Sequence, residues 1–434
     1  MDVLNTLRER TEQAEVYRIE SESTEIAFEA NRMKSAGTEE TKGVALRASV
    51  DGRMGFAAAS GADVAQDELV ENLLASAQFG DPLALRFPGK TEGETVKIFD
   101  AKLAEVPIAR LVEIGQEIVE QLLAVDSDAN IDVSIDRGIH RAWLQNSAGA
   151  DVSEEVSSLS ISVSVQRVRG DDVLMTYEGV SGISLDDDYR EMVARLGDKL
   201  EQARSAATLT SGRMPVLFSP KGALTLIWPL MHAINGQNVQ RGTSPLAERL
   251  GETLLDPQFT LWDDPLLPGR PQSSSHDAEG VPCTRKAPIL KGTCNGFLYD
   301  LRTAALMDTE SSGNGSRSLF ATPSPAPSNL VVEPGDRPLR EIIAEMSHGL
   351  LVEDVLGLGQ GNPSSGAFSN TLGLAFVIKD GEIVGRVKDV SIAGNIYEEL
   401  RKIAALSRES YWVYGRLKMP YLLLPRVNVT SKSS

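Results

Sequence analysis

The pattern of apolar and polar positions in the first 210 residues predicts the same order of elements twice. In the first unit, a short polar helix at 4–13 precedes strands at 15–19, 25–29, 44–50 and 55–59, and an apolar stripe through Leu69 and Leu73 predicts a closing helix. The second unit has a helix at 108–123, strands at 131–135, 139–146, 156–169 and 173–177, and a helix at 186–204. We therefore predict a duplicated helix–β-meander–helix domain, with repeats at 1–90 and 104–210.

Beyond residue 211 the chain becomes rich in glycine and proline and mostly β. Helices are predicted at 221–234, 301–307, 338–346 and 397–406, and strands at 375–378 and 383–387 flank a hairpin turn with the residues Asp380-Gly381. The segments 265–281 and 311–329 are long loops, which in compact domains are usually functional or mobile. The predicted fold class is α+β, with an N-terminal domain at 1–210 and a β-rich C-terminal domain at 211–434.

Charge and composition narrow the class of protein. The 61 acidic and 43 basic residues give a net charge of −18, which repels phosphate and disfavours nucleic acid as a direct partner. The two cysteines, Cys283 and Cys294, are too few for a disulfide framework. The segment 224–234 is the longest apolar-rich stretch and is too short to span a bilayer, and the N-terminus has no signal-peptide pattern. We expect a cytoplasmic protein that does not contact membranes.

Local chemistry does not reveal an intact catalytic site. None of the four histidines, His140, His232, His276 and His348, has another histidine within five residues, as a helical zinc motif requires. The densest set of possible metal ligands is His276-Asp277-Ala278-Glu279, but short acidic loops are common in so acidic a chain, and we predict no metal there. The glycine-rich segments 313–315 and 359–361 either form ordinary turns or present backbone amides to an extended ligand.

A series of motifs in the C-terminal half resembles a known family. The motifs are Asp277-Ala278-Glu279-Gly280, Ser311-Ser312-Gly313-Asn314-Gly315, Gly357-Leu358-Gly359-Gln360-Gly361-Asn362-Pro363, Gly366-Ala367-Phe368-Ser369 and Ile392-Ala393-Gly394-Asn395. In this order and spacing they resemble the TldD/PmbA family, once named for a proposed modulation of DNA gyrase. A looser match at 43–56 extends the resemblance over essentially the whole chain.

The resemblance implies a subtype. TldD-type members are zinc peptidases with His-Glu-x-x-x-His on a helix and a further cysteine ligand near the C-terminus, whereas PmbA-type members, also called TldE, lack these ligands and pair with TldD. Alignment back from residues 240–244 places the motif at 227–232, with Ile227 at the first ligand position, Trp228 at the general-base position and only His232 retained. The segment 411–421 contains no cysteine. The chain therefore resembles the PmbA/TldE type and is expected to hold no metal of its own.

Three functional interpretations remain open. The leading hypothesis is a non-catalytic subunit of a peptidase complex, in which a TldD-type partner brings zinc and this chain helps to hold unfolded peptide. The candidate channel residues are Asp277, Glu279, Gly313, Asn314, Gly315 and Arg317; alternatively, their loops only seal the dimer. The second hypothesis is a metal-free homodimer that binds peptides or acts as a scaffold. The third is an autonomous peptidase with a site around His232, His276 and Asp277.

Overall fold

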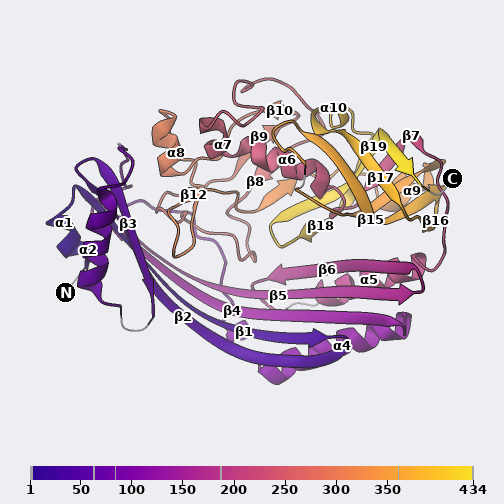
Figure 1. Cartoon of the computed structure of the whole chain (residues 1–434), viewed down its shortest axis with the longest axis horizontal. Coiled ribbons are helices and arrows are strands. Elements are labelled where there is room, and N and C mark those ends of the chain that lie inside the picture. The colour runs from indigo at the N-terminus through magenta and orange to yellow at the C-terminus, as the bar shows by residue number, and fades with distance from the viewer. Residues whose placement is uncertain (1–2, 62–63, 84, 186–187, 360, 433–434) are drawn as a thin grey trace.

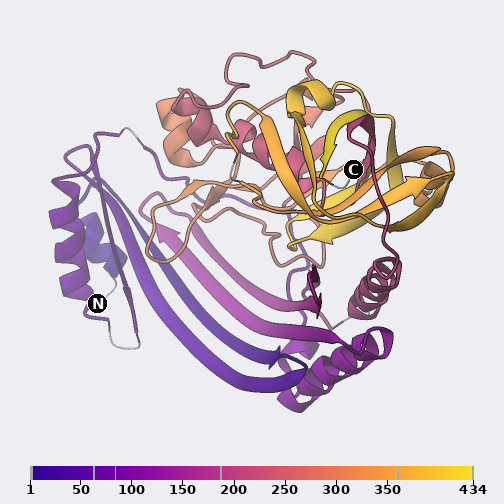
Figure 2. The same ribbon diagram turned by 45° about the vertical axis from the view of Figure 1, so that its right-hand side comes forward.

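The computed structural model describes residues 3–61, 64–83, 85–185, 188–359 and 361–432. A long curved antiparallel sheet carries the N-terminal half, and a β-rich domain lies against its concave side (Figures 1 and 2). This arrangement confirms the predicted α+β class. Among the described residues, no helix is long and apolar enough to cross a membrane.

The N-terminal half contains the predicted duplication, built as one six-stranded sheet in the order β3-β2-β1-β4-β5-β6. The first repeat consists of α1 (Val3–Arg8), β1 (Gln13–Glu29), β2 (Arg32–Val50), β3 (Arg53–Ser60) and α2 (Gln66–Ala77). The second consists of α4 (Ile108–Val125), β4 (Ala129–Asn146), β5 (Asp151–Arg169), β6 (Asp172–Gly182) and α5 (Asp188–Gln202), and the short helix α3 (Ala101–Ala104) precedes it. The two meanders join through antiparallel pairing of β1 with β4.

The strands of this sheet are longer than the sequence pattern indicated. The predicted strands at 15–19 and 25–29 are one strand, β1, and those at 131–135 and 139–146 are one strand, β4. Polar residues such as Ser21 and Glu22 interrupt the apolar alternation, but β1 is paired on both sides, so its backbone hydrogen bonds continue through them. The first two residues of the helix predicted at 186–204, Asp186 and Asp187, lie outside the described residues.

The two faces of the sheet have different roles. One face packs against α1 and α2 at one end, where Val16 and Leu46 are buried, and against α4 and α5 at the other, where Ile26 is buried. Side chains alternate between faces along a strand, so the neighbours of these residues point towards the C-terminal domain. Glu15 and Arg47 are on this second face and are likewise buried.

The C-terminal domain is built on an 11-stranded mixed sheet. Its strands are β7 (Gly212–Phe218), β8 (Leu261–Asp263), β9 (Lys286–Leu290), β10 (Thr293–Cys294), β13 (Leu330–Val332), β14 (His348–Val355), β15 (Ala367–Lys379), β16 (Glu382–Arg386), β17 (Val390–Asn395), β18 (Ala405–Val413) and β19 (Leu417–Ser431). The helices are α6 (Leu224–Ile234), α7 (Gly236–Gln240), α8 (Leu301–Leu306), α9 (Leu339–Ala344) and α10 (Ile396–Glu399), and β11 (Gly315–Ser316) pairs with β12 (Ser324–Pro325).

Most of the predicted C-terminal elements are present, with one clear error. The Asp380-Gly381 turn joins β15 to β16 with positive φ angles of 50° and 82°, as the hairpin prediction requires. The predicted helix at 397–406 is wrong, because α10 ends at Glu399 and Ala405 already belongs to β18. The backbone N–H of Ala404 donates to the carbonyl of Leu423 in β19, so sheet pairing overrides the helical spacing.

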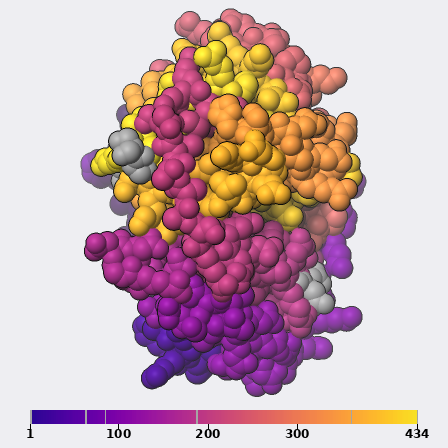
Figure 3. All heavy atoms as spheres, turned by 90° about the vertical axis from the view of Figure 1, so that its right-hand side faces the viewer, coloured from indigo at the N-terminus to yellow at the C-terminus, as the bar shows by residue number. Residues whose placement is uncertain are grey.

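The two halves of the chain share a hydrophobic core and several ion pairs. One buried cluster combines Ile161, Leu196 and Leu200 of the second repeat with Phe376 and Tyr421 of the C-terminal domain. In Figure 3 the yellow and orange C-terminal domain sits directly on the magenta second repeat. The halves are therefore packed as one body rather than joined loosely.

The outer strand β6 is tied to the C-terminal domain through its backbone. Arg386 donates to the carbonyl of Val173 (2.6 Å), Lys221 to that of Tyr177 (2.8 Å) and Arg270 to that of Ser181 (2.7 Å). These cations belong to β16, to the segment before α6 and to the long loop after β8, so three separate parts of the C-terminal domain bind this one strand.

Candidate functional site

A pocket of about 250 Å³ lies between the two long loops of the C-terminal domain and the concave face of the N-terminal sheet. The sheet contributes Tyr17, Leu144 and Glu154, among others. The loops contribute five of the six predicted channel residues, namely Asp277, Gly313, Asn314, Gly315 and Arg317, together with His276. The sixth, Glu279, does not line the pocket. We call this space the loop pocket.

Behind the loop pocket, four charged side chains form a buried ion cluster between the two halves of the chain. Arg47 on β2 contacts Glu279 (2.6 Å) and Glu15 (3.1 Å), and Arg317 contacts the other oxygen of Glu15 (2.6 Å). Burial alone would raise the pKa of Glu15, but Arg317 and Arg47 reverse this effect and hold it below its ordinary value. The cluster fixes the loops on the sheet, so Glu279 acts here as a docking group.

Two nitrogen-bearing side chains of the loop pocket have spare hydrogen-bonding capacity. Arg317 uses one terminal nitrogen for Glu15, but its Nη2 and Nε have no hydrogen-bond partner among the described residues. Its guanidinium lies 4.0 Å from the centre of the Tyr17 ring. The Nε2 atom of His276 is also buried without a partner in the described part of the chain. The two nitrogens of Arg317 are donors and suit a carbonyl or carboxylate, whereas Nε2 of His276 donates or accepts according to the tautomer of the ring.

Asp277 organises the turn that leads into the cluster. Its Oδ1 accepts from the N–H groups of Glu279 (2.9 Å) and Val281 (3.0 Å), and its Oδ2 accepts from Gly315 (2.8 Å). Burial, and then the neighbouring Glu279, raise the pKa of Asp277 to about 7. A Cβ at position 315 would lie 2.6 Å from Oε2 of Glu279, which explains why that position is glycine.

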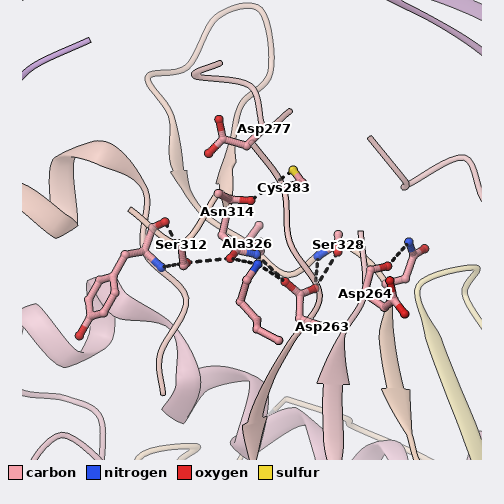
Figure 4. A network of polar contacts seen from close by, with 12 residues as sticks. Asp263, Asp264, Asp277, Cys283, Ser312, Asn314, Ala326 and Ser328 are labelled. Atoms are coloured by element: carbon pink, nitrogen blue, oxygen red, sulfur yellow. Dashed lines mark hydrogen bonds and ion pairs between the residues drawn. The ribbon is translucent and has the colours of Figure 1, made fainter. Parts of the chain in front are cut away.

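Asn314 holds the second loop in place (Figure 4). Its amide nitrogen donates to Oδ2 of Asp263 (2.7 Å), and its Oδ1 accepts from Lys286 (3.0 Å) and Ser312 (2.7 Å). The other oxygen of Asp263 accepts from the backbone and the hydroxyl of Ser328. The Asn314 side chain therefore supports the pocket wall and has its hydrogen-bonding capacity occupied within the protein.

The segment 227–232, which the sequence analysis aligned with a zinc motif, lies on α6, and its side chains do not fit a zinc ion. Ile227 is fully buried in the C-terminal core, and Pro229 lies inside the helix. Trp228 is 46% exposed and offers no metal-binding atom. His232 is held by Asn238 (3.1 Å at Nδ1) and Ser364 (3.2 Å at Nε2), so both ring nitrogens have neutral polar partners.

The structure does not bring His232, His276 and Asp277, the three residues of the third hypothesis, into one pocket. His276 and Asp277 line the loop pocket, but His232 is not among its lining residues. No group of three or more His, Cys, Asp or Glu side chains in the described ranges is placed to hold a metal ion. Burial raises the pKa of the Cys283 thiol well above its usual range, which makes it a poor nucleophile.

Comparison with known proteins identifies the family. Residues 14–77, 101–209 and 211–431 match the models of the PmbA/TldA metallopeptidase domain 1, central domain and C-terminal domain. The chain belongs to this metallopeptidase family, which confirms the resemblance seen in the sequence.

Individual relatives agree with this assignment. The crystal structure of TldE from Thermococcus kodakarensis matches with a TM-score of 0.92 and 25% identity over 99% of both chains. A metalloprotease of Methanothermobacter thermautotrophicus is 24% identical over 92% of this chain and 89% of its own length. The metalloprotease TldD homolog of Haemophilus influenzae is 28% identical over 48% of this chain and 43% of its own length.

No local sequence pattern indicated the residues that the N-terminal sheet contributes to the site. Glu15, Tyr17 and Arg47 belong to strands predicted only as sheet, and Glu154 lies just before the strand predicted at 156–169. The hydrogen-bond partners of Glu15, Arg47 and Glu154 in the C-terminal domain lie far along the chain. Charged residues within apolar strand segments are the sequence signal that could have pointed to the ion cluster. Glu15 and Arg47 interrupt such segments, and both strands are buried at these positions.

Proposed function

We propose that this chain is the non-catalytic, TldE-like subunit of a cytoplasmic TldD/PmbA-family peptidase complex that acts on unfolded peptides or small proteins. The observation that carries the proposal is the state of α6: a core isoleucine at the first ligand position and a tryptophan at the general-base position. A lone imidazole with two neutral partners provides neither a zinc site nor a base to activate water. The similarity to a TldE structure supports the same assignment.

The loop pocket gives the chain a role in such a complex. Arg317 and His276 line it with buried nitrogen atoms that have no partner among the described residues, and these nitrogens would bind an extended peptide, while a TldD-type partner supplies the zinc and the chemistry. The ion cluster behind the pocket keeps Arg317 fixed, because this side chain is anchored through Glu15 to the sheet.

The test is to purify the chain alone and after co-expression with a TldD-type homologue. We expect substoichiometric zinc and no peptidase activity in the chain alone, and a stable mixed dimer with activity after co-expression. A partner whose motif glutamate is changed to glutamine is the matched control, because it should form the dimer without activity. One tightly held zinc per chain, measured by elemental analysis of the chain alone, would overturn the proposal.

The same co-expression experiment distinguishes the subunit proposal from the second hypothesis, a metal-free homodimer. If the chain forms only homodimers in the presence of the homologue, and these bind unfolded peptide without cleaving it, then the subunit proposal fails in favour of a metal-free peptide-binding protein.

A further inference from the structure

A second cavity, of about 300 Å³, lies where the second repeat meets the C-terminal domain. It shares no lining residue with the loop pocket. Strands β5 and β6 and helix α5 form one side, and β18, β19 and the segment before α6 form the other. Its volume falls at the lower end of the range for small-molecule sites. Five aromatic side chains line it, and we call it the aromatic cavity: Tyr177, Tyr411, Trp412, Tyr414 and Tyr421.

Cations already occupy faces of three of these rings. The guanidinium of Arg195 lies 4.1 Å from the centre of Tyr411, and that of Arg270 lies 4.0 Å from the centre of Trp412. The ammonium of Lys221 lies 3.6 Å from the centre of Tyr177. A cationic ligand would be repelled by these charges, so the cavity is not an ammonium-binding aromatic cage. Flat apolar walls instead favour a planar ring.

The two lysines of the cavity differ in how well their charges are compensated. Lys199 lies between Glu178 and Glu353, with 2.6 Å to the latter. Burial alone would lower the pKa of Lys199, but these carboxylates hold it above its ordinary value. Lys199 therefore has little capacity left for a ligand.

Lys221 is the less compensated cation. It is 7% exposed, and it donates to the carbonyl of Tyr177 at 2.8 Å. The nearest carboxylate, Asp354, is 3.6 Å away, which is longer than a good hydrogen bond. Burial lowers the pKa of Lys221, so the site favours an anion that would restore its charge balance. An ammonium has three donors, and a ligand carboxylate can accept one of them.

We propose that the aromatic cavity binds a planar aromatic group that carries one carboxylate, with the ring against the aromatic lining of the cavity and the carboxylate on Lys221. Such a ligand is either a free aromatic acid or the C-terminal aromatic residue of a peptide, and the two share the same chemistry. The inference does not depend on the proposed function, because it uses none of the loop-pocket residues.

The test is calorimetric titration of the full chain with 3-phenylpropionate, its neutral amide and phenethylamine. We expect the acid to bind at least about tenfold more tightly than the amide, as one charge-assisted hydrogen bond predicts, and phenethylamine not to bind. Equal binding of acid and amide, or binding of the amine alone, contradicts the proposal. The tripeptide Gly-Gly-Phe distinguishes the sources: binding as tight as that of the free acid favours a peptide C-terminus, and weaker binding favours a free acid.

Two variants place the binding in this cavity. Lys221→Met should reduce the acid-to-amide preference to within about twofold, since the charge-assisted bond is lost. Lys221 is buried, so its replacement could disturb folding, and a second variant therefore tests the same cavity from an exposed position. Ser162→Phe, on the cavity wall, should block binding of both the acid and the amide. Ser164→Phe is the matched control, as Ser164 is exposed two residues further along β5 and does not line the cavity. Unchanged binding in a folded Ser162→Phe variant would refute the assignment.

Discussion

Arg47 illustrates how one side chain connects distant parts of this protein. It is 6% exposed and bridges Glu15, on the neighbouring strand, to Glu279, which lies 232 residues further along the chain. Removing one partner of a buried ion pair leaves the remaining charges without compensation, and this is more costly than losing the attraction itself. The stability of the loop pocket therefore depends on a residue outside the loops.

We predict that Arg47→Met lowers the free energy of unfolding by about 3–5 kcal/mol, because Glu279 loses its cation and Glu15 keeps only Arg317. Urea denaturation followed by circular dichroism measures the change. Arg10→Met is the control, since Arg10 pairs with Glu71 on the open surface and should alter stability little. Similar midpoints for the two variants would show that the buried cluster is not important for stability.

Asp277 is expected to make stability depend on pH. Its folded pKa of about 7 lies above that of the unfolded chain, about 4, so the folded state holds an additional proton between these values. The stabilisation that Asp277 contributes through this proton is fully present below about pH 4, and it is lost as the pH rises towards 7. The unfolding free energy of the wild type relative to Asp277→Asn should therefore fall with rising pH, by at most about 1.4 kcal/mol per unit. If the unfolding free energies of the wild type and of Asp277→Asn ran parallel from about pH 5 to 8, the raised pKa of Asp277 would be contradicted.

At the scale of the element, α6 is connected to its neighbours through one histidine side chain. His232 joins the end of α6 to the segment before β15 through Ser364, and to α7 through Asn238. This imidazole acts as a connector between neighbouring elements, and its removal should affect packing rather than catalysis.

His232→Ala should lower the unfolding free energy by about 1 kcal/mol, the typical value of a lost hydrogen bond, and leave the peptidase activity of the mixed complex nearly unchanged. His348→Ala, at an exposed position at the start of β14, is the control for loss of an imidazole. A collapse of activity in a folded His232→Ala complex would restore a catalytic role to this residue.

Local signals were sufficient for some elements and failed for others. The apolar segment Leu224–Ile234 and the Asp380-Gly381 turn have strong local patterns, and both are present. The helical spacing at 397–406 was misleading because Ala404 and Ala405 pair with Leu423, a contact across the sheet that no local pattern reveals. The loops around Asp277 and Gly315 could be predicted from local motifs. The sheet residues that contact these loops could not, because their contacts join distant parts of the chain.

At the scale of the whole molecule, the boundary near residue 211 divides the sequence but not the core. Leu351, Phe376 and Tyr421 of the C-terminal domain are buried in a cluster with α4, α5 and the second meander. Cutting the chain at this point exposes apolar surface on both pieces.

We therefore predict that residues 211–434 expressed alone are insoluble or bind a hydrophobic dye such as ANS, whereas co-expression with residues 1–210 restores a soluble complex. Gel filtration and ANS fluorescence measure these outcomes. The full chain is the control for dye binding. A monomeric, dye-free C-terminal fragment would show that the shared cluster contributes little to its folding.

The cations along β6 have a consequence for how this protein avoids unwanted association. An open edge strand is a template on which another chain can add its own strand, and this is how many fibrils grow. Arg386, Lys221 and Arg270 each occupy a carbonyl on this strand, at intervals of four residues. A foreign strand would have to displace three charged groups before it paired, so the molecule blocks polymerisation at β6 with its own side chains.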